Sequence, residues 1–147
     1  MRIAVGSDHA GLDLKRAIVA HLLTLDHDVV DVGTHDKSSC DYPLFAKAAA
    51  GQVMAGEVER AILVCGTGQG MAMTANKVPG VRAAVVADAF SARMASLHND
   101  ARVLCLGERV VGQGVALACV DAWLGAAFEG GRHQRRVDLM TSEPSEA

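Results

Sequence analysis

A short segment around Cys65 holds the residue types best suited to chemistry, in the order Cys65-Gly66-Thr67-Gly68-Gln69-Gly70. Three glycines at alternate positions permit a tight turn in which several backbone N–H groups point into one space. With the positive end of a following helix, such a turn forms an anion hole suited to phosphate, carboxylate or a developing enediolate. The same field favours the thiolate form of Cys65. The alternative interpretation is a tight strand–helix turn beside an inert, buried cysteine.

Asp8 and His9 directly follow the apolar run of residues 2–7, where a strand is expected to end. The Asp8 carboxylate could move protons between hydroxyl groups, and the His9 imidazole could bind a phosphate or act as an acid. The competing interpretation is structural, with Asp8 as the N-cap of a helix and His9 on the surface.

The segment His98-Asn99-Asp100 separates a predicted helix from the fifth predicted strand. Residues of these types often do no more than end a helix. We expect the segment to lie beside the same sheet edge as Cys65, however, and that position favours a functional role for His98 and Asn99.

The basic stretch Arg132–Arg136 (RHQRR) follows Gly130-Gly131. A solvated charged face is one interpretation, and recognition of a phosphate by guanidinium groups is the other. An arm released by two glycines could reach a neighbouring molecule. In that case the binding site would be shared between two subunits.

A dinucleotide site competes with these interpretations, because strand, glycine-rich turn, helix, strand and Asp88 follow one another in the expected order. The third glycine stands at position 70, however, where the GxGxxG pattern requires position 71, and the turn does not follow the first strand. A P-loop is excluded because no Gly-Lys-Ser/Thr follows the turn. We find no metal-ligand motif and no CxxC pair. Reduced thiols are therefore expected at the four cysteines, Cys40, Cys65, Cys105 and Cys119.

Five apolar runs alternate with stretches of helical spacing along the chain. Strands are predicted at residues 2–7, 28–32, 61–65, 81–87 and 102–106. Helices are predicted at residues 11–25, 42–55, about 71–77, 90–97 and 115–128. This alternation predicts a Rossmann-like α/β fold, a three-layer α/β/α sandwich around a five-stranded parallel sheet. Ligands bind such sheets at the carboxyl ends of the strands.

The composition is that of one small globular domain. The chain has 147 residues, 50% hydrophobic and 21% charged, with a formal net charge of -3. This charge excludes a broadly basic nucleic-acid surface. Without a signal-peptide pattern or a run of 18 apolar residues, we expect a cytoplasmic protein with no membrane span. A single domain with a C-terminal basic arm is expected over residues 1–140, followed by a flexible acidic tail over 141–147.

Seven short motifs follow one another along the chain: DHAG at 8–11, DYP at 41–43, CGTGQG at 65–70, ANK at 75–77, HND at 98–100, GERVVG at 107–112 and FEGGRHQRR at 128–136. In this combination the chain closely resembles the type B ribose-5-phosphate isomerases of the ribose/galactose isomerase family, from about residue 2 to residue 140. The resemblance implies an aldose–ketose isomerase that interconverts D-ribose 5-phosphate and D-ribulose 5-phosphate with no metal and no cofactor.

The resemblance also implies the chemical role of each matched residue. Cys65 is the base that moves a proton between carbons 1 and 2 of the sugar. Thr67 helps to open the sugar ring, and His98 is the acid that assists this step. The enediolate is held by the backbone of the turn, at Gly66, Thr67, Gly68, Gln69 and Gly70.

Binding roles follow from the same resemblance. Asp8 and Asn99 hold sugar hydroxyls, with Asp8 also suited to shuttle a proton, and Arg109 contributes to substrate binding. The phosphate is held by His9, Arg132 and Arg136. The site is expected at the interface of a homodimer, or within a homotetramer, with the C-terminal arginines supplied by the partner subunit.

Some positions bear on substrate choice. Arg102 stands where asparagine is common in the family, close enough to HND to affect substrate preference. Cys65 stands where some relatives carry a glutamate base, and the presence of both Cys65 and His98 favours a self-sufficient homo-oligomer over a pair of different chains. The alternatives are an isomerase of allose 6-phosphate, galactose 6-phosphate or a tetrose 4-phosphate, or a non-catalytic module that binds nucleotides or sugar phosphates.

Overall fold

The structure, a computed structural model, describes residues 1–142. One sheet contains five strands, which are β1 (Arg2–Ser7), β2 (Asp28–Gly33), β3 (Arg60–Cys65), β4 (Ala83–Val85) and β5 (Val103–Gly107). Their spatial order is β2-β1-β3-β5-β4, and every neighbouring pair is parallel. The five-stranded parallel sheet predicted from the sequence is therefore confirmed.

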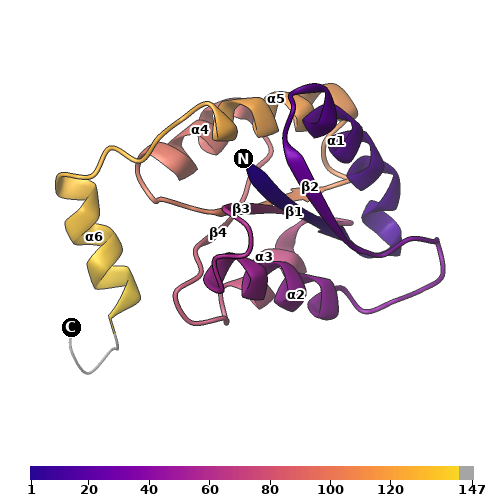
Figure 1. Cartoon of the computed structure of the whole chain (residues 1–147), viewed down its shortest axis with the longest axis horizontal. Helices are drawn as coiled ribbons and strands as arrows, with labels where there is room; N and C mark the ends of the chain where they lie inside the picture. Colours follow the sequence, from indigo (N-terminus) through magenta and orange to yellow (C-terminus); the bar gives the residue numbers. More distant parts are fainter. Residues whose placement is uncertain (143–147) are drawn as a thin grey trace.

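Helices cover both faces of this sheet, with α1, α4 and α5 on one face and α2 and α3 on the other (Figure 1). Their bounds are α1 (Leu12–Thr24), α2 (Tyr42–Met54), α3 (Gln69–Ala75), α4 (Ala89–Leu97) and α5 (Gln113–Leu124). Successive strand residues point to opposite faces. Ile3 and Val5 accordingly pack in the core beneath α1 and α5, whereas Ala4 packs beneath α2. The predicted three-layer sandwich is confirmed.

The two faces differ in the size of their side chains. The α5 face is filled by large groups such as Trp123, which is fully buried and donates its indole N–H to the Ala101 carbonyl oxygen over 2.7 Å. The α2 face is filled mainly by alanines, among them Ala46, Ala49 and Ala50. Small side chains allow α2 to lie close to the sheet, which places its first residue, Tyr42, against Gly70.

Two predicted elements have different bounds in the structure. The strand predicted at residues 81–87 is reduced to Ala83–Val85, because β4 lies at the edge of the sheet and pairs with β5 alone. The helix predicted at residues 115–128 begins earlier, at Gln113, and ends at Leu124. Gly125 follows it and disfavours a further turn.

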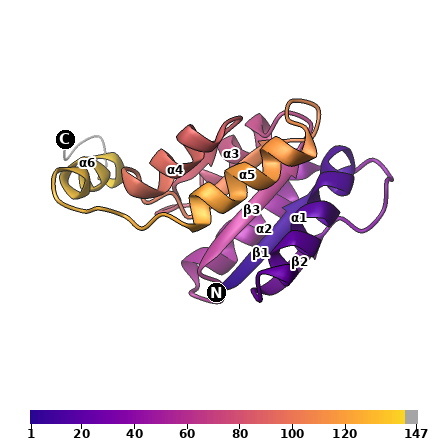
Figure 2. The ribbon, with the colours of Figure 1, turned by 90° about the horizontal axis from the view of Figure 1, so that it is seen from above.

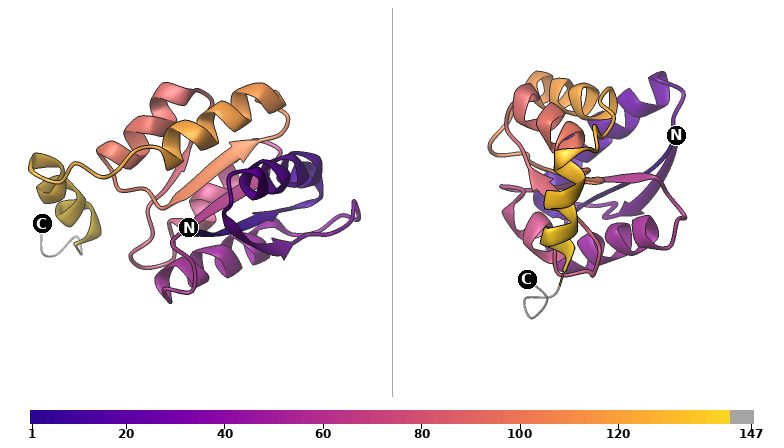
Figure 3. Two further views of the ribbon diagram at one scale, coloured as in Figure 1. Left: turned by 45° about the horizontal axis from the view of Figure 1, so that its top comes forward. Right: turned by 90° about the vertical axis from the view of Figure 1, so that its left-hand side faces the viewer.

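The basic stretch forms a sixth helix, α6 (Arg132–Thr141), which the sequence patterns did not predict. An extended segment joins it to α5, and α6 lies beyond the end of α4, outside the sandwich (Figures 1, 2 and 3). His133 and Val137, one helical turn apart, are buried, whereas Leu139 and Met140 are each 58% exposed. The flexible tail was predicted to begin at residue 141, but Thr141 is the last residue of α6. Residues 143–147 lie outside the described part of the chain.

Among residues 1–142, no helix combines the length and the apolar character needed to cross a membrane.

Candidate active site at two edges of the sheet

The Cys65 turn lies at the carboxyl edge of the sheet. Cys65 is the last residue of β3, pairs in register with Gly107 of β5 and is 5% exposed. The backbone N–H of Gly68 donates to its sulfur over 3.1 Å. Gly68 has a φ of 81° and precedes α3, so the strand–turn–helix arrangement is as predicted. A donated N–H stabilises negative charge on sulfur, which suits a nucleophilic or basic thiolate.

Close backbone packing fixes the shape of this turn. A Cβ on Gly107 would lie 2.6 Å from the Thr67 carbonyl carbon, so only glycine lets β5 approach the turn this closely. The two residues after Gly107 donate their backbone N–H groups to the turn, Glu108 to the Cys65 carbonyl at 2.9 Å and Arg109 to the Gly66 carbonyl at 3.1 Å. The Arg109 guanidinium lies next to Gly66.

Asp8 lies at the same edge and is buried, with only 6% of its surface exposed. Its Oδ1 accepts the N–H groups of Ala10 and Gly11 over 3.0 and 3.1 Å, which caps the short 3-10 helix His9–Gly11. The helix-cap interpretation of Asp8 is therefore correct. The cap engages Oδ1 alone, so it is compatible with a second role for Oδ2.

His9 is half-buried beside Asp8, at the start of the same short helix. The backbone N–H of Cys40 donates to its Nδ1 over 3.2 Å. Because Nδ1 accepts, the neutral ring carries its proton on Nε2. The loop after β2 thus fixes the tautomer of His9 and leaves Nε2–H as the group able to donate to an anion.

His98 and Asn99 lie at the other edge of the sheet, so the prediction that they share an edge with Cys65 is wrong. In this parallel fold α4 starts after the carboxyl end of β4 and runs back toward the amino ends of the strands. His98 caps its C-terminus, and β5 begins only at Val103. Four residue steps along β5, at about 3.3 Å each, place Val103 about 13 Å from Gly107.

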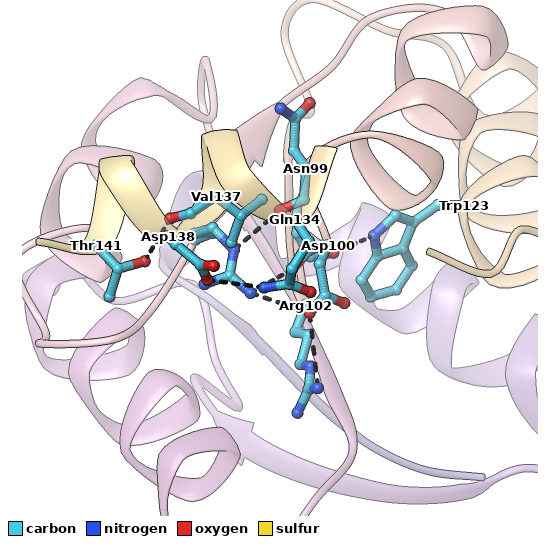
Figure 4. A network of polar contacts seen from close by, with 10 residues as sticks. Asn99, Asp100, Arg102, Trp123, Gln134, Val137, Asp138 and Thr141 are labelled. Atoms are coloured by element: carbon cyan, nitrogen blue, oxygen red, sulfur yellow. Dashed lines mark hydrogen bonds and ion pairs between the residues drawn. The ribbon is translucent and has the colours of Figure 1, made fainter. Parts of the chain in front are cut away.

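Asn99 and Asp100 lie in this second segment (Figure 4), and Arg82 holds the segment in place. Its Nε donates to the Asn99 carbonyl over 2.9 Å, and its Nη2 donates to the carboxylate of Asp100 over 3.0 Å and to the Asp100 carbonyl over 3.2 Å. Asp100 has a φ of 44°, a left-handed conformation that these contacts stabilise. Arg102 also pairs with Asp100 at 3.7 Å, but it is largely exposed. Sequence patterns did not single out Arg82.

Helix α6 joins the same edge through His133, whose ring stacks on His98 with centroids 4.1 Å apart. Burial, followed by the neighbouring charge of His98, lowers the pKa of His133 below its usual value. Glu129, just before α6, donates its backbone N–H to the Leu97 carbonyl over 3.0 Å. Arg132 and Arg136 are exposed on the same helix, one turn apart. Segments this far apart in the sequence gave no signal of their contact.

The predicted site residues thus form two groups. The carboxyl edge holds the thiol, the turn, Arg109, Asp8 and His9, whereas the amino edge holds His98 and Asn99 and the arginines of α6. A parallel α/β sandwich with a glycine-rich turn and a cysteine at its carboxyl edge belongs to a class of folds in which this edge is suited to bind a small anionic ligand.

The particular family follows from comparison with known proteins. Residues 3–140 match the Ribose/Galactose Isomerase family, and the chain belongs to it. The ribose-5-phosphate isomerase B of Escherichia coli K12 is 49% identical over 141 residues, which cover 96% of this chain and 95% of that protein.

Solved structures agree with this assignment. The ribose-5-phosphate isomerase B of Clostridium thermocellum has a TM-score of 0.95 and 51% identity, covering 96% of this chain and 95% of that one. The enzyme of Mycoplasma genitalium, solved with bound ribulose-5-phosphate, has a TM-score of 0.92 and 44% identity, covering 99% of this chain and 97% of that one.

Proposed function

We propose that this protein is an aldose–ketose isomerase that interconverts D-ribose 5-phosphate and D-ribulose 5-phosphate through an enediolate. The observation that carries the proposal is the Gly68 N–H donated to the Cys65 sulfur at the end of β3. A base and a group of N–H donors then stand in one turn, which is what removal of a proton next to a carbonyl requires. Ribulose-5-phosphate bound to the Mycoplasma genitalium relative supports the choice of substrate.

The proton transfer is assigned to Cys65. Its thiolate removes the proton from carbon 2 of the open aldose, the carbonyl electrons move onto oxygen 1, and the thiol returns the proton to carbon 1 to give the ketose. The turn N–H groups between Gly66 and Gly70 stabilise the enediolate oxygens while the charge is on them. Asp8 transfers the remaining proton between the two oxygens. The hydrogen stays within one substrate, so no redox cofactor takes part.

The ring-opening and phosphate-binding roles involve residues of both edges. His98 is the acid for ring opening, assisted by Thr67, and Asn99 holds a sugar hydroxyl. The Nε2–H of His9 donates to the phosphate, together with Arg132, Arg136 and Arg109. Fixing the phosphate orients the reacting carbons against Cys65.

The two groups combine if the protein is a homodimer with two shared sites. Within one chain, His98 and Asn99 lie across the sheet from Cys65, and the arginines of α6 lie with them. Two-fold symmetry can bring His98, Asn99 and the α6 arginines of one copy to the carboxyl edge of the other copy. The same symmetry then forms an equivalent second site, with the roles of the two copies exchanged. The exposed Leu139 and Met140 of α6 provide apolar surface for this contact. We place the dimer, or a tetramer of such dimers, in the cytoplasm.

Substitution of Cys65 tests the activity. Steady-state kinetics on ribose 5-phosphate should show a loss of about 10²–10⁴-fold in Cys65→Ala. Cys119→Ala is the matched control, because Cys119 is a buried thiol on α5, in the core on the face of the sheet opposite α2 and α3. The control should keep the wild-type rate. A wild-type rate in Cys65→Ala would remove Cys65 from the reaction.

A second candidate is the same reaction on another sugar phosphate, which the ribose/galactose name of the family favours. Ratios of kcat/KM on ribose 5-phosphate, allose 6-phosphate, galactose 6-phosphate and a tetrose 4-phosphate decide between them. A non-catalytic binding module is the remaining alternative. It would show calorimetric binding of NAD, ATP or a sugar phosphate with no turnover on any sugar.

A further inference from the structure

Three potential metal ligands meet at the amino edge of the sheet. The ring nitrogens of His98 and His133 and a carboxylate oxygen of Glu129 all lie within 4.8 Å of one another. The two imidazoles are stacked, with ring centroids 4.1 Å apart and an angle of 11° between their planes. The closest carboxylate oxygen of Glu129 lies 3.7 Å from the Nε2 of His133.

Burial of the His133 Nε2 atom is not compensated by a hydrogen bond from any of residues 1–142. The residue is 6% exposed, yet its Nε2 atom is buried with no hydrogen-bond partner in the described part of the chain. A buried polar nitrogen without a partner is costly, and it needs an explanation such as an ion. The distance of 3.7 Å to Glu129 is too long for a hydrogen bond.

The donor set selects the kind of ion. Two imidazole nitrogens and one carboxylate suit Zn²⁺ and similar late transition metals, with open positions for water or substrate. Mg²⁺ and Ca²⁺ require mainly oxygen ligands and would not choose two imidazoles. In a tetrahedral zinc site two ligand nitrogens lie about 3.4 Å apart, so modest rotation of half-exposed His98 and exposed Glu129 closes the cluster around an ion.

We propose that His98, Glu129 and His133 form a binding site for Zn²⁺ or a similar divalent ion, and that its occupation inhibits the enzyme. The inhibition rests on the proposed function, because it takes away the ring nitrogen with which His98 acts on the sugar. No electron transfer is involved, and any proton on a ligand imidazole is released when the ion binds. The bound ion would also tie Glu129 and α6 to the end of α4.

The binding half is tested on the full-length protein with Co²⁺ as the probe, in a Cys65→Ala background that removes the thiol at the carboxyl edge. We expect d–d absorption that saturates at one Co²⁺ per chain, with no thiolate-to-metal charge-transfer band. Glu129→Gln and His133→Asn should each weaken binding at least tenfold. His35→Asn, which removes an exposed histidine far along the chain from the cluster, is the control and should bind as the parent does.

Absence of saturable d–d absorption would overturn the site. So would binding that is unchanged in both Glu129→Gln and His133→Asn, because the ion would then be held elsewhere. Two different variants are used so that a folding defect in one does not decide the outcome. These spectra do not depend on turnover, so they remain informative even if the protein fails to isomerise ribose 5-phosphate.

The inhibition half is tested by kinetics with Zn²⁺. The wild-type rate should fall as Zn²⁺ is added and return when a chelator is added. Glu129→Gln should keep the metal-free rate, because Glu129 has no part in the reaction, and should need at least ten times more Zn²⁺ for half inhibition. Equal sensitivity of Glu129→Gln and wild type would overturn this half and place the inhibitory ion on another group, such as Cys65.

Discussion

Cys65 and His98 lie at opposite edges of the same parallel sheet. Cys65 ends β3 opposite Gly107, whereas His98 ends α4 and leads into the amino end of β5. Helix α4 must run back across the sheet before the next parallel strand can begin, so the separation is built into the topology. The proposed base and the proposed acid can therefore act on one substrate only when two copies of the chain meet.

A mixing experiment tests this arrangement. Cys65→Ala and His98→Asn should each be nearly inactive as pure proteins. When they are unfolded, mixed in equal amounts and refolded, half of the dimers carry one of each chain. Each mixed dimer has one site with both defects and one site with none, so about a quarter of the wild-type activity should return.

The control is refolding of each variant alone, which should restore nothing. If the mixture also stays inactive while size measurements show dimers, then Cys65 and His98 belong to the same site within one chain, and the shared-site arrangement is wrong.

Gly107 determines how closely β5 approaches the catalytic turn. A Cβ at this position would lie 2.6 Å from the backbone of Thr67, and backbone cannot yield as a flexible side chain does. Gly107→Ala should therefore cost about 1–3 kcal/mol of unfolding free energy and reduce kcat more than Cys119→Ala does. Urea denaturation and kinetics measure the two effects.

Gly114→Ala is the matched control for Gly107. Gly114 lies in α5, and a Cβ there would meet nothing within 4 Å. Alanine is favoured over glycine in a helix by about 1 kcal/mol, so this variant should be as stable as the parent or more stable, with unchanged activity. Equal behaviour of the two variants would mean that the turn tolerates displacement.

The tautomer of His9 is a direct consequence of the Cys40 backbone contact. Since Nδ1 accepts the Cys40 N–H over 3.2 Å, the neutral ring should carry its proton on Nε2. Nitrogen-15 chemical shifts of the His9 ring report which nitrogen is protonated. Cys40→Ala retains the backbone donor, so it should retain the same tautomer. A neutral ring protonated on Nδ1 would contradict the proposed phosphate contact.

Arg82 is expected to position Asn99 without touching the substrate. Arg82→Ala removes three hydrogen bonds, including one to the Asp100 carboxylate, and should cost about 2 kcal/mol of unfolding free energy. Loss of the left-handed turn at Asp100 should also displace Asn99 and raise KM more than it lowers the rate of the proton transfer. Arg82→Lys keeps the charge but not the planar fork, so it should recover only part of the stability.

Arg102→Asn serves as the control for Arg82. Its guanidinium reaches the same carboxylate at 3.7 Å, but the side chain is 58% exposed. An exposed pair of this kind contributes little, and the unfolding free energy should change by no more than about 0.5 kcal/mol. If Arg102→Asn proves as damaging as Arg82→Ala, the contact between Arg82 and Asn99 is not what holds the segment.

The sheet and its helices could be predicted from the sequence because apolar periodicity reports burial directly. Runs such as residues 61–65 are buried on both faces and give a continuous apolar signal. Helix α6 gave no such signal, because it buries only His133 and Val137 and leaves Leu139 and Met140 exposed. Part of its burial comes from the stack of His133 on His98, a contact with a distant segment that local patterns do not report.

The sequence predicted the positions of some candidate site residues correctly and the position of His98 wrongly. The Cys65 turn and Asp8 were placed correctly, since each directly follows a strand that ends at the carboxyl edge. His98 was placed at the wrong edge because a residue that precedes a strand lies at its amino end. The stack of His98 on His133 and the hydrogen bond from Arg82 to the Asn99 carbonyl are tertiary contacts between distant segments. Such contacts cannot be predicted from the local patterns of a single sequence.

The four cysteines should differ widely in their reaction with iodoacetamide. Cys40 is half-exposed and should react first, whereas Cys65, which is buried at the carboxyl end of β3, should react more slowly and be protected by ribose 5-phosphate. Burial raises the pKa of Cys105, and a nearby Cys65 charge raises it further; burial also raises the pKa of Cys119. A raised pKa keeps both thiols protonated at neutral pH, and the protonated thiol is a poor nucleophile.

Mass spectrometry of timed digests measures this order at each cysteine. Cys105 and Cys119 should remain unlabelled at pH 7.5 until a denaturant unfolds the chain. Loss of isomerase activity should follow the labelling of Cys65 and be slowed by substrate to the same degree. If activity is lost in step with Cys105 labelling instead, inactivation proceeds by unfolding, and alkylation does not identify Cys65 as the base.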